Sequence, residues 1–230
     1  RTGTLWAGTL NGLYALHRYA KPFAHLGADP HDPASLHSPI VMAVQESRDG
    51  TRWIGTLGGG LHRLDARSGR LTPVHATTRA GCNALVWALY EDRRQHLWIG
   101  TDEGVCVLDP RTGLARRIVL PFPDPRTQQP VNTFAEDAAG RLWIGTRLGL
   151  YRLDPPIGAI RYVPNPDSTK TLWGRNFIQL LVPSRNGGFW VGTFGGFLFH
   201  LDPATETFTP YRIRFNRQRL ASEGLWAIHE

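Results

Sequence analysis

RLWIGTRLGLYRLD, residues 141–154, contains the core W-x-G-T, and this core occurs five times along the chain. The copies are LWAGT, RWIGT, LWIGT, LWIGT and FWVGT, and the intervals between their tryptophans are 47, 45, 45 and 47 residues. The tryptophans are Trp6, Trp53, Trp98, Trp143 and Trp190. A repeat in the mid-forties is typical of a repeat protein whose unit is one small sheet, as in a propeller blade.

Around this core, each repeat reads as four short strands. In the clearest copy these are residues 131–137, 141–146, 150–154 and 159–163, separated by turns rich in Asp, Gly and Pro. The tryptophan is bulky enough to fill the wedge between adjacent blades, and the glycine after it permits close packing of a neighbouring backbone. Helical periodicity is absent. The sequence therefore predicts an all-β fold, a β-propeller of five four-stranded antiparallel blades, with residues 1–230 as a single domain.

The two ends of the chain complement each other in this pattern. Residues 224–230 (GLWAIHE) match the first strand of a unit, as in residues 85–91 (LVWALYE), whereas the chain begins with a turn and a second strand. The last strand could therefore complete the first blade, an overlap by which propellers hide their terminal edges. Any cut at a whole number of repeats gives the same match. Two alternatives stay open: a closed five-bladed ring, or a fragment of a larger ring.

The composition is that of a globular protein with a sizeable core, since 41% of the residues are hydrophobic. The net charge of +7 comes almost wholly from arginine, because Lys21 and Lys170 are the only lysines. These arginines are spread through every repeat without a basic run, so no nucleic-acid partner is expected. Cys82 and Cys106 fit no metal-ligand spacing. A disulfide between them stays open, and a small buried thiol in an apolar strand is the alternative for Cys106.

The repeat resembles a known family, the two-component regulator propeller repeat. The resemblance rests on LWIGT followed by G-L-x-R-L-D and a D-P-x-T-G turn, and it covers essentially the whole chain. Residues 27–44 and 165–181 look like that family's lead-in to a blade. The resemblance implies the periplasmic sensor region of an inner-membrane protein whose output is a histidine kinase, a hybrid kinase or a diguanylate cyclase. Such propellers usually have seven blades, and well-studied relatives sense carbohydrates.

A ligand is expected on the face that carries the connections between blades. These connections are long and dissimilar, whereas the turns within blades are short and alike, and variable loops on a rigid scaffold usually carry binding. Arg147 and Arg175 lie in loops on the same side and could meet an anionic group. Aligning the innermost strands on their distance from the tryptophan adds one chemically mixed column near that face. The column consists of Met42, Trp87, Asn132, Gln179 and Trp226.

This column predicts a ligand-binding site, because indole faces stack on sugar rings and amides hydrogen-bond to hydroxyl groups. The alternative is structural. Trp87 and Trp226 would then fill gaps between blades, while Asn132 and Gln179 would bond to backbone groups. The arginines would be ordinary solvated surface residues.

The main hypothesis is a sensor that binds a small molecule or glycan and performs no chemistry of its own. It needs no cofactor or metal and has no catalytic residue. Its other partners would be neighbouring domains of the same signalling protein or a second copy in a homodimer, with the membrane reached only through segments outside this sequence.

Two other classes stay open: a propeller hydrolase or lyase with an axial site, and a protein–protein interaction platform. The nine histidines show no metal-ligand spacing, and sequence alone identifies no pair of carboxylates for glycosidase chemistry. A glutamate ends the innermost strand in most units, which indicates a structural position. These glutamates are Glu46, Glu91, Glu136 and Glu230.

Overall fold

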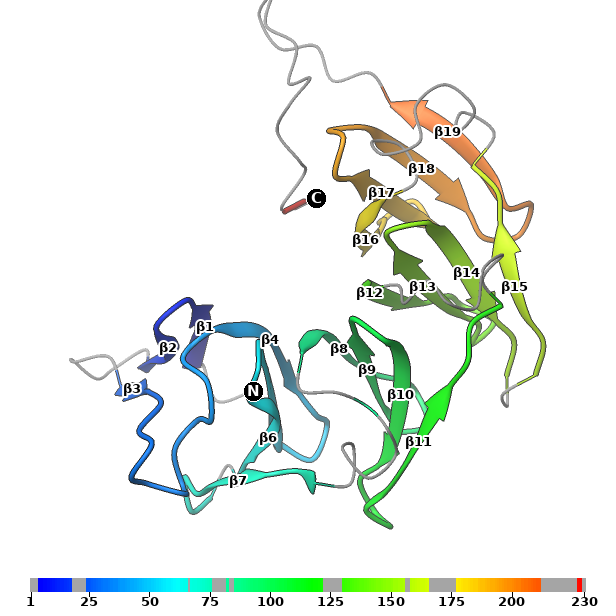
Figure 1. Ribbon diagram of the computed structural model, residues 1–230. Coiled ribbons are helices and arrows are strands. Elements are labelled where there is room, and N and C mark those ends of the chain that lie inside the picture. The colour runs from blue at the N-terminus through cyan, green and yellow to red at the C-terminus, as the bar shows by residue number, and fades with distance from the viewer. Residues whose placement is uncertain are drawn as a thin grey trace, which may run out of the picture. The chain divides into compact units, whose positions relative to one another are not determined.

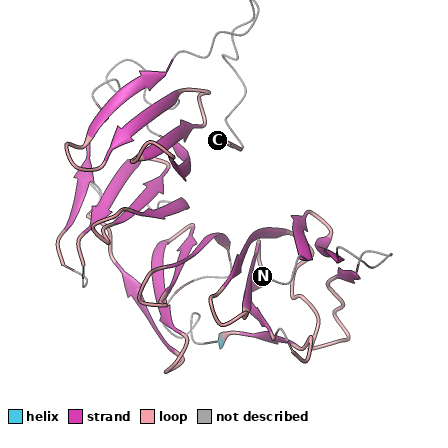
Figure 2. Ribbon diagram, turned by 180° about the vertical axis from the view of Figure 1, so that it is seen from behind, coloured by secondary structure: helices cyan, strands magenta, loops and turns pink. Residues whose placement is uncertain are grey.

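The computed structural model of the protein describes residues 4–17, 24–65, 67–75, 82, 85–121, 130–155, 158–165, 177–211 and 227–228. Its nineteen named elements are all strands. They form five antiparallel sheets (Figure 1; Figure 2). This confirms the predicted all-β fold of small antiparallel sheets. Within the described residues, no helix has the length and apolar character of a membrane span.

The chain divides into two compact units, Arg1–Val119 (unit 1) and Leu120–Glu230 (unit 2). That residues 1–230 form a single domain stays a prediction. Unit 1 has three sheets, made of β1 (Thr4–Thr9), β2 (Gly12–His17) and β3 (Ala24–Leu26); β4 (Val41–Glu46), β5 (Arg52–Thr56), β6 (Gly60–Leu64) and β7 (Leu71–Pro73); and β8 (Val86–Glu91), β9 (Leu97–Thr101), β10 (Gly104–Asp109) and β11 (Leu114–Ile118). Unit 2 has two, made of β12 (Val131–Glu136), β13 (Leu142–Thr146), β14 (Gly149–Leu153) and β15 (Ile160–Val163); and β16 (Ile178–Pro183), β17 (Phe189–Thr193), β18 (Leu198–Asp202) and β19 (Thr207–Tyr211).

Each sheet is a meander in which strands that are consecutive in the chain pair with each other. The W-x-G-T motif forms the second strand in four sheets and the first described strand, β1, in the remaining one. That sheet has three described strands. Its predicted fourth strand, residues 224–230, lies outside the described part of the chain apart from Ala227 and Ile228. Completion of this sheet by the C-terminus therefore stays a prediction.

The glycine of W-x-G-T lets neighbouring sheets approach each other closely. A Cβ on Gly8 would lie 2.8 Å from Cγ1 of Val41, and a Cβ on Gly145 would lie 2.7 Å from Cγ2 of Ile178. In both cases the partner is a β-branched residue that begins the first strand of the next sheet. A side chain at the glycine would occupy the space that this residue fills. The described pairs of this kind are Gly8–Val41, Gly55–Val86 and Gly145–Ile178.

The tryptophan of the same motif lies between its own sheet and the next one. Trp53 of β5 packs in a core cluster with Val86 and Ile99 of the following sheet. Trp143 of β13 likewise shares a cluster with Ile178 of the following sheet. Both indoles are buried. These contacts confirm that the tryptophan fills the wedge between adjacent blades.

Two of the indole N–H groups donate to a carboxylate six residues earlier in the chain. Trp98 bonds to Asp92 and Trp143 to Asp137, each at 2.9 Å. Asp137 also accepts the backbone N–H and the guanidinium of Arg141. Burial alone would raise the pKa of Asp137, but these hydrogen bonds hold it below its ordinary value. The buried carboxylate therefore stays ionised and ties the turn between the first two strands to the core.

Two of the connecting segments are anchored to the sheet that they lead into. In both cases the anchor point is the third residue of the third strand of that sheet. Before β4, the backbone N–H of His37 donates to Nε2 of His62 in β6 at 3.3 Å, across 25 residues. Before β8, Cys82 forms a disulfide with Cys106 in β10, across 24 residues. His62 and both cysteines are buried. The two links are equivalent in the repeat, and the disulfide that the sequence left open is formed.

We predict that Gly55→Ala destabilises the protein by about 1–3 kcal/mol, because its new methyl group would meet Val86 of the next sheet. Equilibrium chemical denaturation measures the loss. Val86→Ala alone should also be destabilising, since it removes buried methyl groups. The double variant should be clearly more stable than the sum of the two losses, because the smaller partner makes room. Strictly additive losses would contradict the close sheet contact.

We also predict that the protein loses stability as the pH falls from about 6.5 towards 4. Burial lowers the pKa of His62 from 6.5 to about 4, assisted by the neighbouring imidazoles of His37 and His75. The unfolded chain therefore takes up this proton at a higher pH than the folded one, and stability decreases by up to about 3 kcal/mol across that window. Melting temperatures measured between pH 4 and 8 provide the test. His62→Gln keeps an acceptor without this titration, so its pH dependence should be flatter; an unchanged slope would refute the assignment.

Candidate functional site

Each described first strand has a β-bulge at the same place. In β4, Val41 pairs with Thr56 and Ala43 with Gly55, so Met42 is an extra residue opposite the Gly-Thr of W-x-G-T. The same register shift occurs in β8, β12 and β16. The extra residues are Met42, Trp87, Asn132 and Gln179. They are the described members of the column that the sequence predicts as a ligand site.

The bulge separates this column from the core. The residue just before each bulge is at most 6% exposed, whereas Met42 is 38% exposed and the other three are partly exposed. A bulge bends its strand and redirects a side chain. A scaffold that otherwise repeats thus presents a thioether, an indole and two amides at equivalent positions.

In unit 1, Met42 and Trp87 lie on the neighbouring first strands β4 and β8. Nε1 of Trp87 is buried and finds no acceptor among the described residues. Nearly all buried polar groups in proteins are hydrogen-bonded, so an indole N–H of this kind has unused donor capacity.

In unit 2, Asn132 and Gln179 lie on the neighbouring first strands β12 and β16. Nδ2 of Asn132 donates to the backbone carbonyl of Ile178 at 3.0 Å, which links the two sheets. For Asn132, the structure therefore agrees with the alternative that the amide is bonded to backbone. The Gln179 amide makes no hydrogen bond to a described residue, so it retains both donor and acceptor capacity.

Arg147 lies in the turn between β13 and β14, and its backbone N–H donates to the carbonyl of Pro130, just before β12, at 3.4 Å. Its guanidinium carbon lies 5.5 Å from the centre of the Phe177 ring. Phe177 precedes β16 and stacks on Phe194, which follows β17, with ring centres 4.9 Å apart and planes 14° apart. Phe194 is 45% exposed. We call Arg147, Phe177, Phe194 and Gln179 the unit 2 cluster.

The sequence identified Arg147 and Gln179 but missed the two phenylalanines. A usable signal was the residue directly after W-x-G-T, because it begins the turn on this face in every repeat. That position is Leu10, Leu57, Asp102, Arg147 and Phe194. The other two predicted residues, Arg175 and Trp226, lie outside the described part of the chain.

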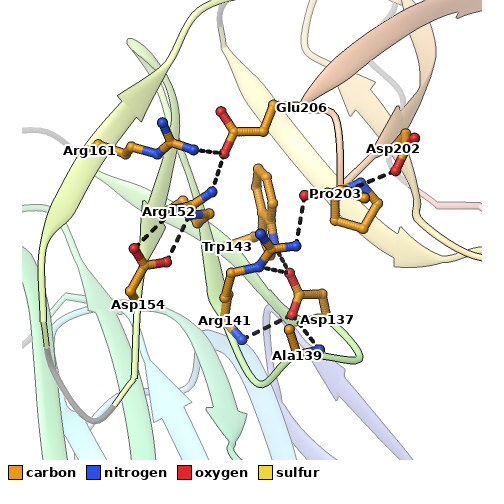
Figure 3. A network of polar contacts seen from close by, with 11 residues as sticks. Asp137, Ala139, Arg141, Trp143, Arg152, Asp154, Arg161, Asp202, Pro203 and Glu206 are labelled. Carbon is orange, nitrogen blue, oxygen red and sulfur yellow. Dashed lines mark hydrogen bonds and ion pairs between the residues drawn. The ribbon is translucent and has the colours of Figure 1, made fainter.

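The opposite end of unit 2 carries a network of ion pairs (Figure 3). Arg152 pairs with Asp154 at 2.9 Å and also with Glu206, which in turn pairs with Arg161. Glu206 has a φ of +59°, at the turn position that Gly113 occupies with a φ of +71° in another repeat. A non-glycine residue in this conformation is strained. The ion pairs link the two sheets of unit 2 and offset that strain.

Two of the recurrent glutamates at the end of the first strand form structural ion pairs. Glu46 pairs with Arg52 at 3.3 Å, and Glu91 pairs with Arg48 of the preceding sheet at 3.8 Å. This agrees with the structural role expected from their recurrence. No three His, Cys, Asp or Glu side chains in the described residues are grouped as metal ligands.

Comparison with known proteins places these features in a family. A family model described as SMP-30/Gluconolactonase/LRE-like region matches residues 41–177. No curated protein matches the chain. The predicted resemblance was to the two-component regulator propeller repeat, so the matching family model carries a different description.

Solved structures share the fold. Two extracellular domains from B. thetaiotaomicron, of proteins described as hybrid two-component systems, align over 100% and 97% of this chain with 22% and 25% identity and TM-scores of 0.78 and 0.74. The chain covers only 29% and 28% of those two structures. Virginiamycin B lyase from Staphylococcus aureus aligns over 93% of this chain and 68% of its own, with 14% identity and a TM-score of 0.69. These likenesses agree with the predicted propeller fold.

Proposed function

We propose that this chain, which belongs to the SMP-30/gluconolactonase/LRE-like family, is a ligand-sensing propeller in the extracytoplasmic part of a membrane-bound signalling protein. Its ligand would be a small molecule or a carbohydrate. The observation that carries the proposal is the row of bulged positions. There, a scaffold of near-identical repeats presents side chains that differ in chemistry from one repeat to the next.

The bulged side chains suit recognition of a sugar. Trp87 is partly exposed and offers the apolar surface of an indole ring, and the Gln179 amide makes no hydrogen bond to a described residue. Apolar surface with a few well-placed polar groups is the usual composition of a small-molecule site. Within unit 2, the exposed ring of Phe194 offers a surface of its own on which a sugar ring could stack.

An extracytoplasmic location is supported by two observations. Disulfides persist mainly in oxidising compartments, and the Cys82–Cys106 disulfide lies in the core of unit 1. Two of the structures that share the fold are extracellular domains of proteins described as two-component systems. On this proposal the chain is periplasmic, and ligand binding biases the geometry of adjoining domains that carry a histidine kinase or diguanylate cyclase output.

A second candidate function is catalysis. The name of the matching family includes gluconolactonase, and one protein that shares the fold is a lyase. A propeller hydrolase or lyase would bind a similar ligand but convert it. The two candidates therefore differ in whether product appears after binding.

We predict that the protein binds an oligosaccharide without converting it, and that Trp87→Ala combined with Trp226→Ala weakens this binding about tenfold. Removing the indole faces takes away stacking surface worth at least about 1.4 kcal/mol. Calorimetric titration with a panel of neutral and acidic oligosaccharides measures affinity, and chromatography of the mixtures detects product.

Leu114→Ala is the matched control, because Leu114 is 73% exposed on β11, away from the bulges. An affinity that the double tryptophan variant leaves unchanged would remove the bulged column as the site. Release of product would favour the enzyme instead.

We also predict that replacing both Cys82 and Cys106 with alanine destabilises the protein by about 3 kcal/mol, because a loop of this length is no longer closed in the unfolded chain. Thermal unfolding with and without a reducing agent measures the effect. The reducing agent should lower the melting temperature of the natural protein and leave that of the double variant unchanged. Two titratable thiols in protein purified from an oxidising compartment would argue against the disulfide and the location.

A further inference from the structure

We propose that the ligand of unit 2 is an acidic sugar, whose carboxylate binds Arg147 while its ring lies on Phe194. This inference rests on the proposed function. It adds the charge of the ligand and the residues that bind the charged group. It follows from where unit 2 keeps its charged groups. The described carboxylates of unit 2 all lie at one end, and the unit 2 cluster lies at the other.

The carboxylates gather where β12 meets β13, β14 meets β15 and β18 meets β19. They are Glu136, Asp137, Asp154, Asp202 and Glu206. The described arginines at that end include Arg141, Arg152 and Arg161, each of which pairs with one of these carboxylates (Figure 3). Positive charge at that end is therefore compensated within the protein.

Arg147 differs, because its guanidinium forms no ion pair with any described residue. Its side chain is exposed, and the guanidinium lies over the ring of Phe177. A cation over an aromatic ring is attracted to the face of that ring, which orients the guanidinium. The planar fork of donors stays available for a carboxylate, the anion whose geometry it matches.

The phenylalanines provide the apolar half of the site. Phe177 supports both the guanidinium on its face and the exposed ring of Phe194 in a near-parallel stack. Phe194 is held in place by its backbone N–H, which donates to the carbonyl of Phe177 at 3.0 Å. Phe177 thus holds a guanidinium and an exposed ring in one cluster. This pair suits a ligand that carries both an apolar ring face and an anionic substituent, as an oligomer of uronic acids does. The free amide of Gln179 lies at the same end of β16 and can bond to hydroxyl groups.

One of the three corresponding turns in unit 1 has the opposite charge, and the other two carry no charged residue. The charged turn, between β9 and β10, carries Asp102 and Glu103, and Glu103 pairs with Arg117 of the same sheet at 3.9 Å. The positive turn is therefore a property of unit 2 and is not imposed by the repeat.

The test compares trigalacturonate with its fully methyl-esterified form, which has the same rings without the charge. Calorimetric titration is carried out on the full chain, on Arg147→Gln and on Phe194→Ala. Arg116→Gln is the matched control, because it removes another exposed arginine, from β11 of unit 1. Melting temperatures verify that each variant is folded.

We expect the natural protein to bind trigalacturonate at least tenfold more tightly than the ester. Arg147→Gln should remove this preference, whereas Arg116→Gln should keep it. Phe194→Ala should weaken both ligands, because stacking does not depend on the charge.

Three results would overturn the inference. Equal affinity for the acid and the ester would show that the site does not recognise the carboxylate. The proposed function would still hold, with a neutral sugar as the ligand. Equally tight, Arg147-dependent binding of polyglutamate would show that the site accepts any polyanion and reads no sugar ring. If neither sugar form binds, the acidic-sugar inference is wrong, and the proposed function is then decided separately by the wider oligosaccharide panel and the bulged tryptophans.

Discussion

The close approach of neighbouring sheets, in which a glycine faces a β-branched side chain, sets the geometry on which the other features depend. Val41 and Ile178 lie against glycines of the preceding sheet, and the residue that follows each of them is the bulged one. In each case, one residue packs against the preceding sheet and the residue after it is turned away from the core by the bulge. With the sheets this close, the indole of the same motif fills the remaining wedge. In Trp53, Trp98 and Trp143 its N–H donates to a side chain six residues earlier in the chain. Asp137 supplies that acceptor for Trp143.

The repeat made the fold predictable because each copy reports the same local constraints. The period, the four-strand unit and the wedge role of Trp53 and Trp143 follow from residues whose effects are local or concern the adjoining sheet. The mixed column could be found because its distance from the tryptophan is fixed. The β-bulges that produce this column could not be predicted. All the described first strands have the same length, so the sequence does not show that each contains an extra residue. Closure of the first sheet depends on residues outside the described part of the chain.

The site was only partly predictable because its contacts join residues from different sheets. Phe177 and Phe194 meet only after two sheets have packed, and neither residue type recurs at its position. Asn132 is a second case, because the sequence left a ligand contact and a backbone bond open, and only the packed sheets show its bond to the carbonyl of Ile178. The link between His37 and His62 was not visible either. In one repeat the link is a hydrogen bond from a backbone N–H, and in the next it is a disulfide. The two linked positions therefore share no residue type between the repeats.

These two equivalent links have a consequence for how the connecting segments can vary. Because the chain is anchored just before each sheet begins, the few residues from the anchor to the first strand must keep their length, whereas those ahead of the anchor need not. Insertions between Leu26 and His37 should leave the following strands in register. New recognition loops can thus be grafted upstream of an anchor without redesign of the sheet that it enters, and a covalent anchor should accept larger grafts than a hydrogen-bonded one.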